Sequence, residues 1–167
     1  MSRQKSTSWA VLILGSVVLA EGMGKLLAPV GYAAALSKFD VIPPHVGPQV
    51  AALWTALEIL SGLGLLVGGA TVESATWARH WARASAFVAL ALSLAYAALT
   101  LSAYRRGLAI SNCTCFGIYL PQRLSAWVLF QDLYMIGFCG WQAWRLSGRW
   151  RKAVVLTTLA GDRGGAR

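Results

Sequence analysis

The chain has 167 residues, of which 57% are hydrophobic and 13% are charged. An ordinary soluble domain has roughly 45–50% apolar and about 25% charged residues, so a soluble globule is excluded. A disordered chain is excluded too, because disordered segments are poor in apolar residues. The net charge of +9 would suggest nucleic acid in a soluble protein, but here the basic residues lie between and beyond the apolar stretches. We therefore predict one compact membrane domain with no nucleic-acid partner.

Four apolar windows are long enough to cross a bilayer, which takes about 20 residues per helix. They run from about Trp9 to Ala28, Val50 to Ala70, Arg83 to Arg105 and Leu124 to Trp144. Because backbone in lipid must satisfy its hydrogen bonds internally, we predict an all-α integral membrane protein, a four-transmembrane-helix bundle. The membrane domain would cover residues 9–145, after a cytoplasmic N-terminus (1–8) and before a basic cytoplasmic tail (146–167).

The Lys and Arg residues of the short loops predict the orientation of the bundle. Ten of the 15 basic residues fall on one side, which we expect to be cytoplasmic: Arg3, Lys5, Arg79, Arg83, Arg145, Arg149, Arg151, Lys152, Arg163 and Arg167. Both termini are then inside (N-in/C-in). The long loops at 29–49 and 106–123 would face the periplasmic or extracytoplasmic side of an inner (plasma) membrane.

The first apolar window also has features of a signal peptide. Arg3 and Lys5 precede the apolar run, and Ala20 is a small residue near a cleavage point. The run continues past Glu21 through Leu27, however, which favours an uncleaved first span.

The first outer loop contains a second helical signal. Residues 32–39 predict a short interfacial helix with Tyr32, Leu36 and Phe39 on one face. Pro43-Pro44 then predict an extended crossing into the second span, because proline disfavours helix in the residue before it.

The pattern with the sharpest chemical meaning is Asn112-Cys113-Thr114-Cys115-Phe116-Gly117, in the second outer loop. Disulfides form and persist outside the cytoplasm. A Cys-x-Cys ring is feasible but strained, and strained, exposed disulfides are the exchanging kind. We predict Cys113 and Cys115 as a redox couple, and Arg105 and Arg106 would lower a thiol pKa if the loop folds back.

Two other interpretations of the cysteine pair stay open. The pair is a static staple, or it binds a soft metal with His45, although three candidate ligands are few and we rank this below exchange. Cys139 lies about 22 Å into the fourth span at 1.5 Å per residue, so we expect it to pack as a small apolar residue. Without a second cysteine pair to relay electrons, exchange with an external partner fits better than a self-contained disulfide generator.

Three carboxylates fall inside the predicted spans, where acids are costly and mark functional sites. Glu21 lies four residues before Lys25, so we predict a structural ion pair on one helix face, with Lys25–Glu58 as an interhelical alternative. Glu58 and Asp132 fall in the outer half of the bundle, beneath the cysteine loop. They would handle protons during thiol exchange or contact a quinone-like head group; the plainer alternative is interhelical hydrogen bonding.

Several segments resemble a known family. They are Glu21-Gly-Met-Gly-Lys25-Leu-Leu-Ala-Pro29, Gly31 to Leu36, Pro43-Pro44, and Glu58 followed by Ser61-Gly-Leu-Gly64. These resemble DoxX-like membrane proteins over about residues 9–145. With Cys113-Thr-Cys115-Phe-Gly117, the chain is similar to the branch of methylamine-utilisation protein MauE. Thr114 departs from the glycine that is more usual between these cysteines.

The resemblance implies a four-span redox-associated protein. MauE proteins are linked to processing, transport or maturation of the small, disulfide-rich subunit of methylamine dehydrogenase, alongside a thioredoxin-like partner. We therefore expect thiol–disulfide exchange through Cys113 and Cys115 with a thioredoxin-like or secreted client protein. The alternative is a non-catalytic membrane subunit or scaffold of an oxidoreductase complex, whose cysteines would be structural or metal-binding.

Overall fold

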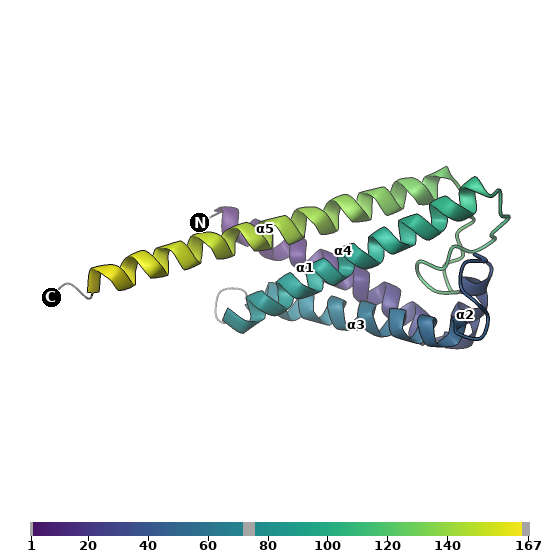
Figure 1. Cartoon of the computed structure of the whole chain (residues 1–167), viewed down its shortest axis with the longest axis horizontal. Coiled ribbons are helices and arrows are strands. Elements are labelled where there is room, and N and C mark those ends of the chain that lie inside the picture. Colours follow the sequence, from purple (N-terminus) through teal and green to yellow (C-terminus); the bar gives the residue numbers. More distant parts are fainter. Residues whose placement is uncertain (1, 72–75, 165–167) are drawn as a thin grey trace.

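The structure is a computed structural model that describes residues 2–71 and 76–164, and this part of the chain is all-helical (Figure 1). Its helices are α1 (Ser2–Leu26), α2 (Pro29–Ser37), α3 (Gly47–Thr71), α4 (Thr76–Arg105) and α5 (Ala126–Gly164). Helix α1 packs on α3, α3 on α4, and α4 on α5, while α2 packs on α3. Helix α2 and the two long loops gather at one end of the bundle, away from both chain termini (Figure 1).

Prolines set the boundaries of the short helix. Ala28 has a non-helical backbone (φ −142°, ψ 64°) because it precedes Pro29, which occupies the first turn of α2. The first long loop therefore contains a short helix, as predicted, but the helix begins at Pro29 and ends at Ser37, so Phe39 lies outside it. Its predicted apolar face, with Tyr32 and Leu36, is buried against the bundle.

Two apolar clusters fill the interior at opposite ends of the bundle. The termini-end core comprises Val11, Leu14, Val18, Leu65, Ala82, Ala86, Ala89, Cys139, Ala143 and Leu146. The loop-end core comprises Tyr32, Leu36, Phe39, Ala51, Ala103 and Ile110. Along α3 and α4, the buried residues Glu58 and Tyr96 fall between the two clusters in sequence. A polar layer therefore separates the two apolar cores.

Three helices in the described part of the chain are long and apolar enough to cross a membrane: Trp9–Leu26, Gly47–Ala70 and Thr76–Arg105. They match the first three predicted windows. The fourth window lies in α5, which is not among the three and which carries Gln131 and Asp132 near its start. Large apolar side chains are exposed around the bundle, including Leu53, Leu60, Phe87, Leu94, Phe130 and Leu133, as expected of a helical protein surrounded by lipid.

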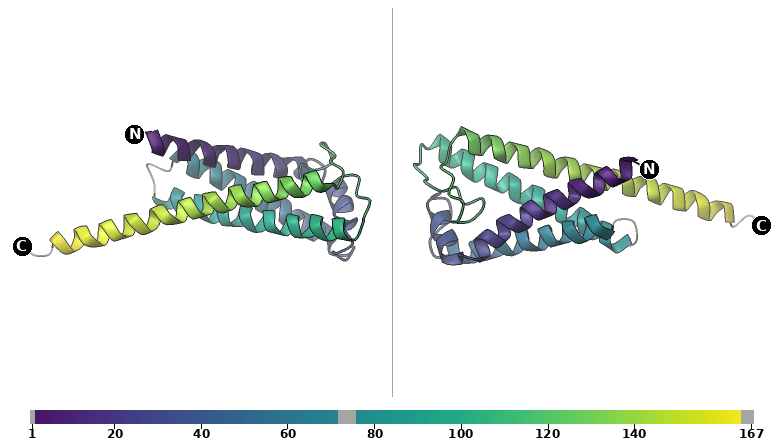
Figure 2. Two further views of the ribbon diagram at one scale, coloured as in Figure 1. Left: turned by 90° about the horizontal axis from the view of Figure 1, so that it is seen from above. Right: turned by 180° about the vertical axis from the view of Figure 1, so that it is seen from behind.

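Helix α5 continues beyond the bundle. It runs without a break from Ala126 to Gly164, a length of 39 residues, and its far end projects past the other helices (Figure 2). The predicted boundary between membrane domain and tail at residue 146 therefore falls inside one continuous helix.

Candidate functional site

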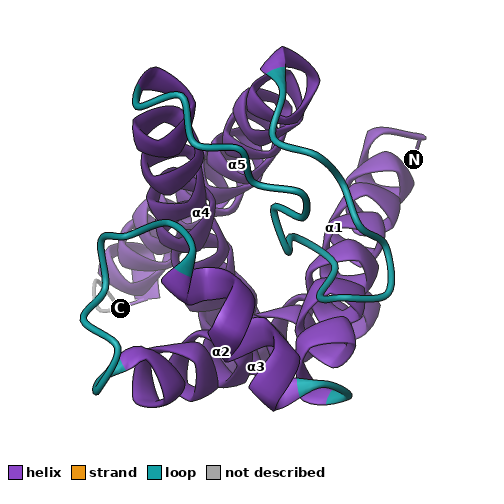
Figure 3. Ribbon diagram, turned by 90° about the vertical axis from the view of Figure 1, so that its right-hand side faces the viewer, coloured by secondary structure: helices purple, strands orange, loops and turns teal. Residues whose placement is uncertain are grey.

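The loop between α4 and α5 folds back across the end of the bundle towards α1 (Figure 3). Within it, the Asn112 side chain accepts a hydrogen bond from the Thr114 N–H (2.9 Å), and the Gly117 N–H donates to the Thr114 carbonyl (3.0 Å). Thr114 has φ +62°, in the left-handed region that glycine adopts more easily than a β-branched residue. A glycine at this position would adopt that backbone without strain.

This turn brings the two thiols together. Cys113 and Cys115 are both free, and their Sγ atoms lie 3.4 Å apart, whereas a disulfide has an S–S length of about 2.05 Å. The Cys113 N–H donates to the Gln122 carbonyl (2.8 Å), and its Sγ lies 3.8 Å from the Gln122 side-chain oxygen. The pair is thus held in a geometry from which a bond needs only a small movement.

The two thiols have unequal electrostatic surroundings. A hydrogen bond from the Cys115 thiol lowers the pKa of Cys113, against the opposing effect of burial. The same hydrogen bond, with burial, raises the pKa of Cys115. Asp132 raises both pKa values by a smaller amount. The hydrogen bond within the pair therefore favours ionisation of Cys113 over that of Cys115.

Neither predicted arginine supplies this effect. The Arg106 guanidinium donates to the carbonyl oxygens of Phe39 and Asp40, and it lies 3.7 Å from the Asp40 carboxylate. Arg106 therefore joins the two long loops to each other. The prediction that Arg105 and Arg106 lower the pKa of a cysteine was wrong. The hydrogen bond from Cys115 lowers the pKa of Cys113 instead.

The cysteine loop rests directly on α1 through two glycines. A Cβ atom on Gly24 would lie 2.6 Å from the Phe116 carbonyl oxygen, and one on Gly117 (φ +72°) would lie 2.4 Å from the Gly24 carbonyl oxygen. Both distances are too short for any side chain, so glycine is required on both sides. The contact places the loop beside Lys25.

Replacing Gly24 by alanine is expected to push the loop away from α1. Alanine favours helix more than glycine, so α1 itself should gain stability, while the added methyl group overpacks the contact at a cost of about 1–3 kcal/mol. Hydrogen exchange at the Cys113 and Gly117 amides should become faster.

Gly137→Ala is the matched control, because a Cβ at Gly137 of α5 meets nothing within 4 Å. Slow exchange at Cys113 and Gly117 in both variants would show that the glycine contact does not hold the loop.

Beneath the loop, a buried ion pair joins α1 to α3. The Lys25 ammonium lies 2.5 Å from the Glu58 carboxylate, and both side chains are inaccessible to solvent. The Trp54 indole N–H also donates to Glu58 (3.2 Å). The Lys25 ammonium lies over the rings of Tyr96 (4.6 Å) and Tyr32 (5.4 Å), whose hydroxyl groups are 2.9 Å apart. This cluster connects α1, α2, α3 and α4.

The ion pair is the interhelical alternative rather than the predicted pair within α1. Among the described residues, no salt bridge joins Glu21 to Lys25; Glu21 lies one turn before Lys25 and is half-buried. One oxygen of Glu58 is buried without a hydrogen-bond partner. One carboxylate oxygen of Glu58 is therefore paired with Lys25, and the other has no hydrogen-bond partner.

Asp132 has a separate partner. Its carboxylate accepts a hydrogen bond from the Thr100 hydroxyl (2.5 Å), which links α5 to α4. Thr100 and Tyr96 were not predicted, because a hydroxyl residue in an apolar window has no distinguishing pattern. Trp54 was signalled only by its place four residues before Glu58.

The remaining candidates lie apart from this cluster. Cys139 packs in the termini-end core, as predicted, with Sγ 3.7 Å from the Ser93 hydroxyl. His45 is exposed in the first long loop. In the part of the chain that the structure describes, no three His, Cys, Asp or Glu side chains are arranged to hold a metal ion.

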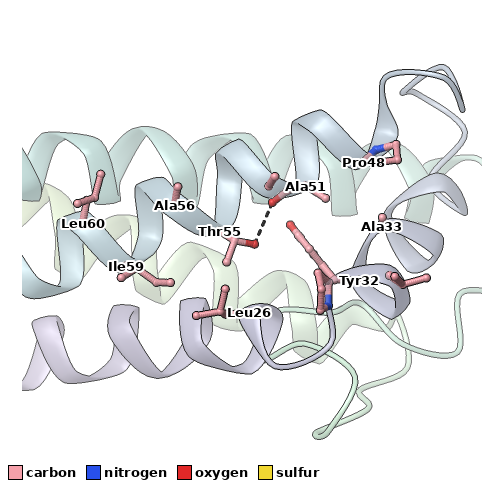
Figure 4. Close-up of a pocket in the computed structure, with 12 residues that line it drawn as sticks. Leu26, Tyr32, Ala33, Pro48, Ala51, Thr55, Ala56, Ile59 and Leu60 are labelled. Atoms are coloured by element: carbon pink, nitrogen blue, oxygen red, sulfur yellow. Dashed lines mark hydrogen bonds between the residues drawn. The ribbon is translucent and has the colours of Figure 1, made fainter.

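An apolar cavity of about 600 Å³ lies between α1, α2 and α3 (Figure 4). Tyr32 and Thr55 are its polar members, and the Thr55 hydroxyl is already hydrogen-bonded to the Ala51 carbonyl (2.9 Å). Neither Glu58 nor Asp132 lines it. The cavity therefore offers no contact between these acids and a quinone-like head group.

Comparison with known proteins gives one match. The family model described as methylamine utilisation protein MauE matches residues 3–145, which includes the cysteine loop, the buried ion pair and Asp132. No curated protein and no solved structure matches the chain.

Proposed function

This chain belongs to the methylamine utilisation protein MauE family, and from that premise we propose that it supports methylamine dehydrogenase biogenesis by thiol–disulfide exchange. The observation that carries the proposal is the Cys113–Cys115 pair, with free Sγ atoms 3.4 Å apart. Exchange proceeds by attack of a thiolate on a disulfide sulfur. The hydrogen bond within the pair favours one thiolate, which is the state that exchange needs.

The client in this proposal is an extracytoplasmic protein or its thioredoxin-like partner. The bundle spans the inner membrane four times, with α5 as the fourth span and both termini inside. The Lys and Arg distribution supports this orientation, since ten of the 15 basic residues fall on the side of the termini. The cysteine loop, α2 and the other long loop then face the periplasmic side.

The polar layer supports the pair in this proposal. Asp132 is the carboxyl group with the largest electrostatic effect on the pKa values of both cysteines. We therefore assign to Asp132 the transfer of protons at the loop. Glu58 holds Lys25 in place. Because Lys25 follows Gly24 directly, the ion pair also fixes the part of α1 on which the loop rests.

The test measures, in intact spheroplasts, the redox state of the cysteine pair and the side of the membrane on which it lies. A membrane-impermeant maleimide of high mass should modify Cys115 only after treatment with a reductant, and the modified fraction should vary reversibly with the ratio of dithiol to disulfide in the buffer. Strained or exposed disulfides titrate in this way, unlike structural ones. A mass shift on denaturing gels measures the fraction.

Three results would count against exchange. Thiols that stay reduced in air would indicate metal binding or an inert pair, and a bond that resists reductant would indicate a static staple. Modification that begins only after lysis would place the loop in the cytoplasm, where such disulfides are rare.

A further inference from the structure

The two cysteines differ in their access to solvent. Cys113 is 1% exposed, whereas Cys115 is partly exposed. The Gln122 side-chain oxygen lies 3.8 Å from Sγ of Cys113, and the Gln122 carbonyl accepts a hydrogen bond from the Cys113 N–H. On the other side, Thr114 is fully buried and its hydroxyl donates to the Cys113 carbonyl (2.7 Å). Of the two residues, Cys115 is therefore the one with surface open to solvent.

We propose that Cys115 is the sulfur that exchanges with the partner and that Cys113 is the buried sulfur that opens and closes the internal disulfide. This assignment rests on the proposed function, to which it adds the order of the steps and the class of substrate, a protein dithiol. The accessible sulfur forms the mixed disulfide, and the covered sulfur reacts only within the chain.

The first step starts from the oxidised chain, in which Cys113 and Cys115 share a disulfide. A thiolate of the partner attacks Sγ of Cys115. A bond forms between the partner sulfur and Cys115, the Cys113–Cys115 bond breaks, and its electron pair leaves on Sγ of Cys113. A thiol with a lowered pKa leaves faster, and the pKa of Cys113 is the lower of the two.

The second step resolves the mixed disulfide. The second thiolate of the partner attacks the partner sulfur that is bound to Cys115 and displaces Cys115 as a thiolate. The partner has then lost two electrons and gained a disulfide, and Cys113 and Cys115 have gained them as a dithiol. The two protons of the partner thiols pass to the cysteine pair by way of solvent and the Asp132 carboxyl group, to which the proposed function assigns proton transfer at the loop. The reverse sequence reduces a partner disulfide.

The test uses the full-length chain in mild detergent with the anionic disulfide dithiobis(nitrobenzoate), which releases a coloured thiolate at each exchange. In the Cys113→Ser variant, Cys115 should react at least about ten times faster than Cys113 does in the Cys115→Ser variant, because exchange rates depend on access to the sulfur and Cys115 is the more exposed residue. The variant that lacks both cysteines measures the background from Cys139. Denatured samples should show equal total thiol in the two single variants, and circular dichroism checks their helical content.

The reduced wild-type chain separates the two proposals. It should release two coloured thiolates for each internal disulfide formed, because Cys113 attacks Sγ of Cys115 and expels the second reagent thiolate. If the wild-type chain releases two coloured thiolates but the single variants react at equal rates, or Cys113 reacts faster than Cys115, the assignment is overturned and the exchange function still stands. Release without an internal disulfide would overturn both.

Discussion

A chain in which Cys113 and Cys115 are both serine is expected to lose thiol–disulfide exchange completely and to keep its helical fold. Serine is close to cysteine in size, and the Thr114 turn is held by backbone and Asn112 hydrogen bonds that do not involve sulfur. Exchange needs a sulfur nucleophile, so no residual activity should come from the hydroxyl groups. In a methylamine-utilising host that depends on this chain, active methylamine dehydrogenase should fall to the level of a strain without the chain.

Cys139→Ser is the matched control for this variant. It makes the same chemical change in the termini-end core, where Cys139 contacts the Ser93 hydroxyl, and it should leave both exchange and enzyme maturation intact. Normal enzyme maturation in the double variant, with circular dichroism showing an intact bundle, would instead support a non-catalytic subunit or scaffold.

Replacing Lys25 by methionine is expected to cause the largest loss of stability of any single change in the polar layer. The substitution leaves the Glu58 carboxylate buried without its cation, and removal of one member of a buried pair costs about 3–5 kcal/mol. The ammonium also contacts the Tyr32 and Tyr96 rings, so α2, α3 and α4 all lose a contact with α1. Thermal unfolding in detergent should show a lower midpoint, and the cysteine loop should become more open to alkylation.

The double variant Lys25→Met with Glu58→Gln tests the reason for the loss. A neutral glutamine still accepts the Trp54 indole hydrogen bond, and replacement of a whole buried ion pair is often nearly neutral, so most of the stability should return. Lys38→Met makes the same change at an exposed lysine and should alter the free energy of unfolding by less than about 0.5 kcal/mol. Equal losses in the single and double variants would argue against the unpaired carboxylate as the cause.

Local patterns were enough to predict the helices of this protein. The apolar windows lie within α1, α3, α4 and α5, and the short helix in the first long loop was expected from its apolar spacing. Pro29 extended that helix backwards, because proline suits the first turn. The fourth window was the weakest in hydropathy, and the four-span topology stays a proposal.

The cysteine pair was predictable as a pair but not as a geometry. A separation of one residue keeps the two Cα atoms within about 7 Å of each other, but it does not fix where the thiols point. The 3.4 Å distance between their Sγ atoms depends on the left-handed backbone of Thr114, on the Gln122 contacts and on the close contact of the loop with Gly24. Gln122 lies outside the motif in the same loop, and Gly24 belongs to α1, so neither contact is part of the local sequence pattern.

The sequence by itself determined which segments are helical, which end carries the cysteines and which acids are buried, because hydropathy and turn preference depend on neighbours along the chain. Only the tertiary structure decided which groups pair. Lys25 had Glu21 one turn away and Glu58 on another helix, and it binds Glu58; Asp132 binds Thr100. The partner of a buried charge depends on how each helix is rotated about its axis, and the packing of the two apolar cores sets that rotation.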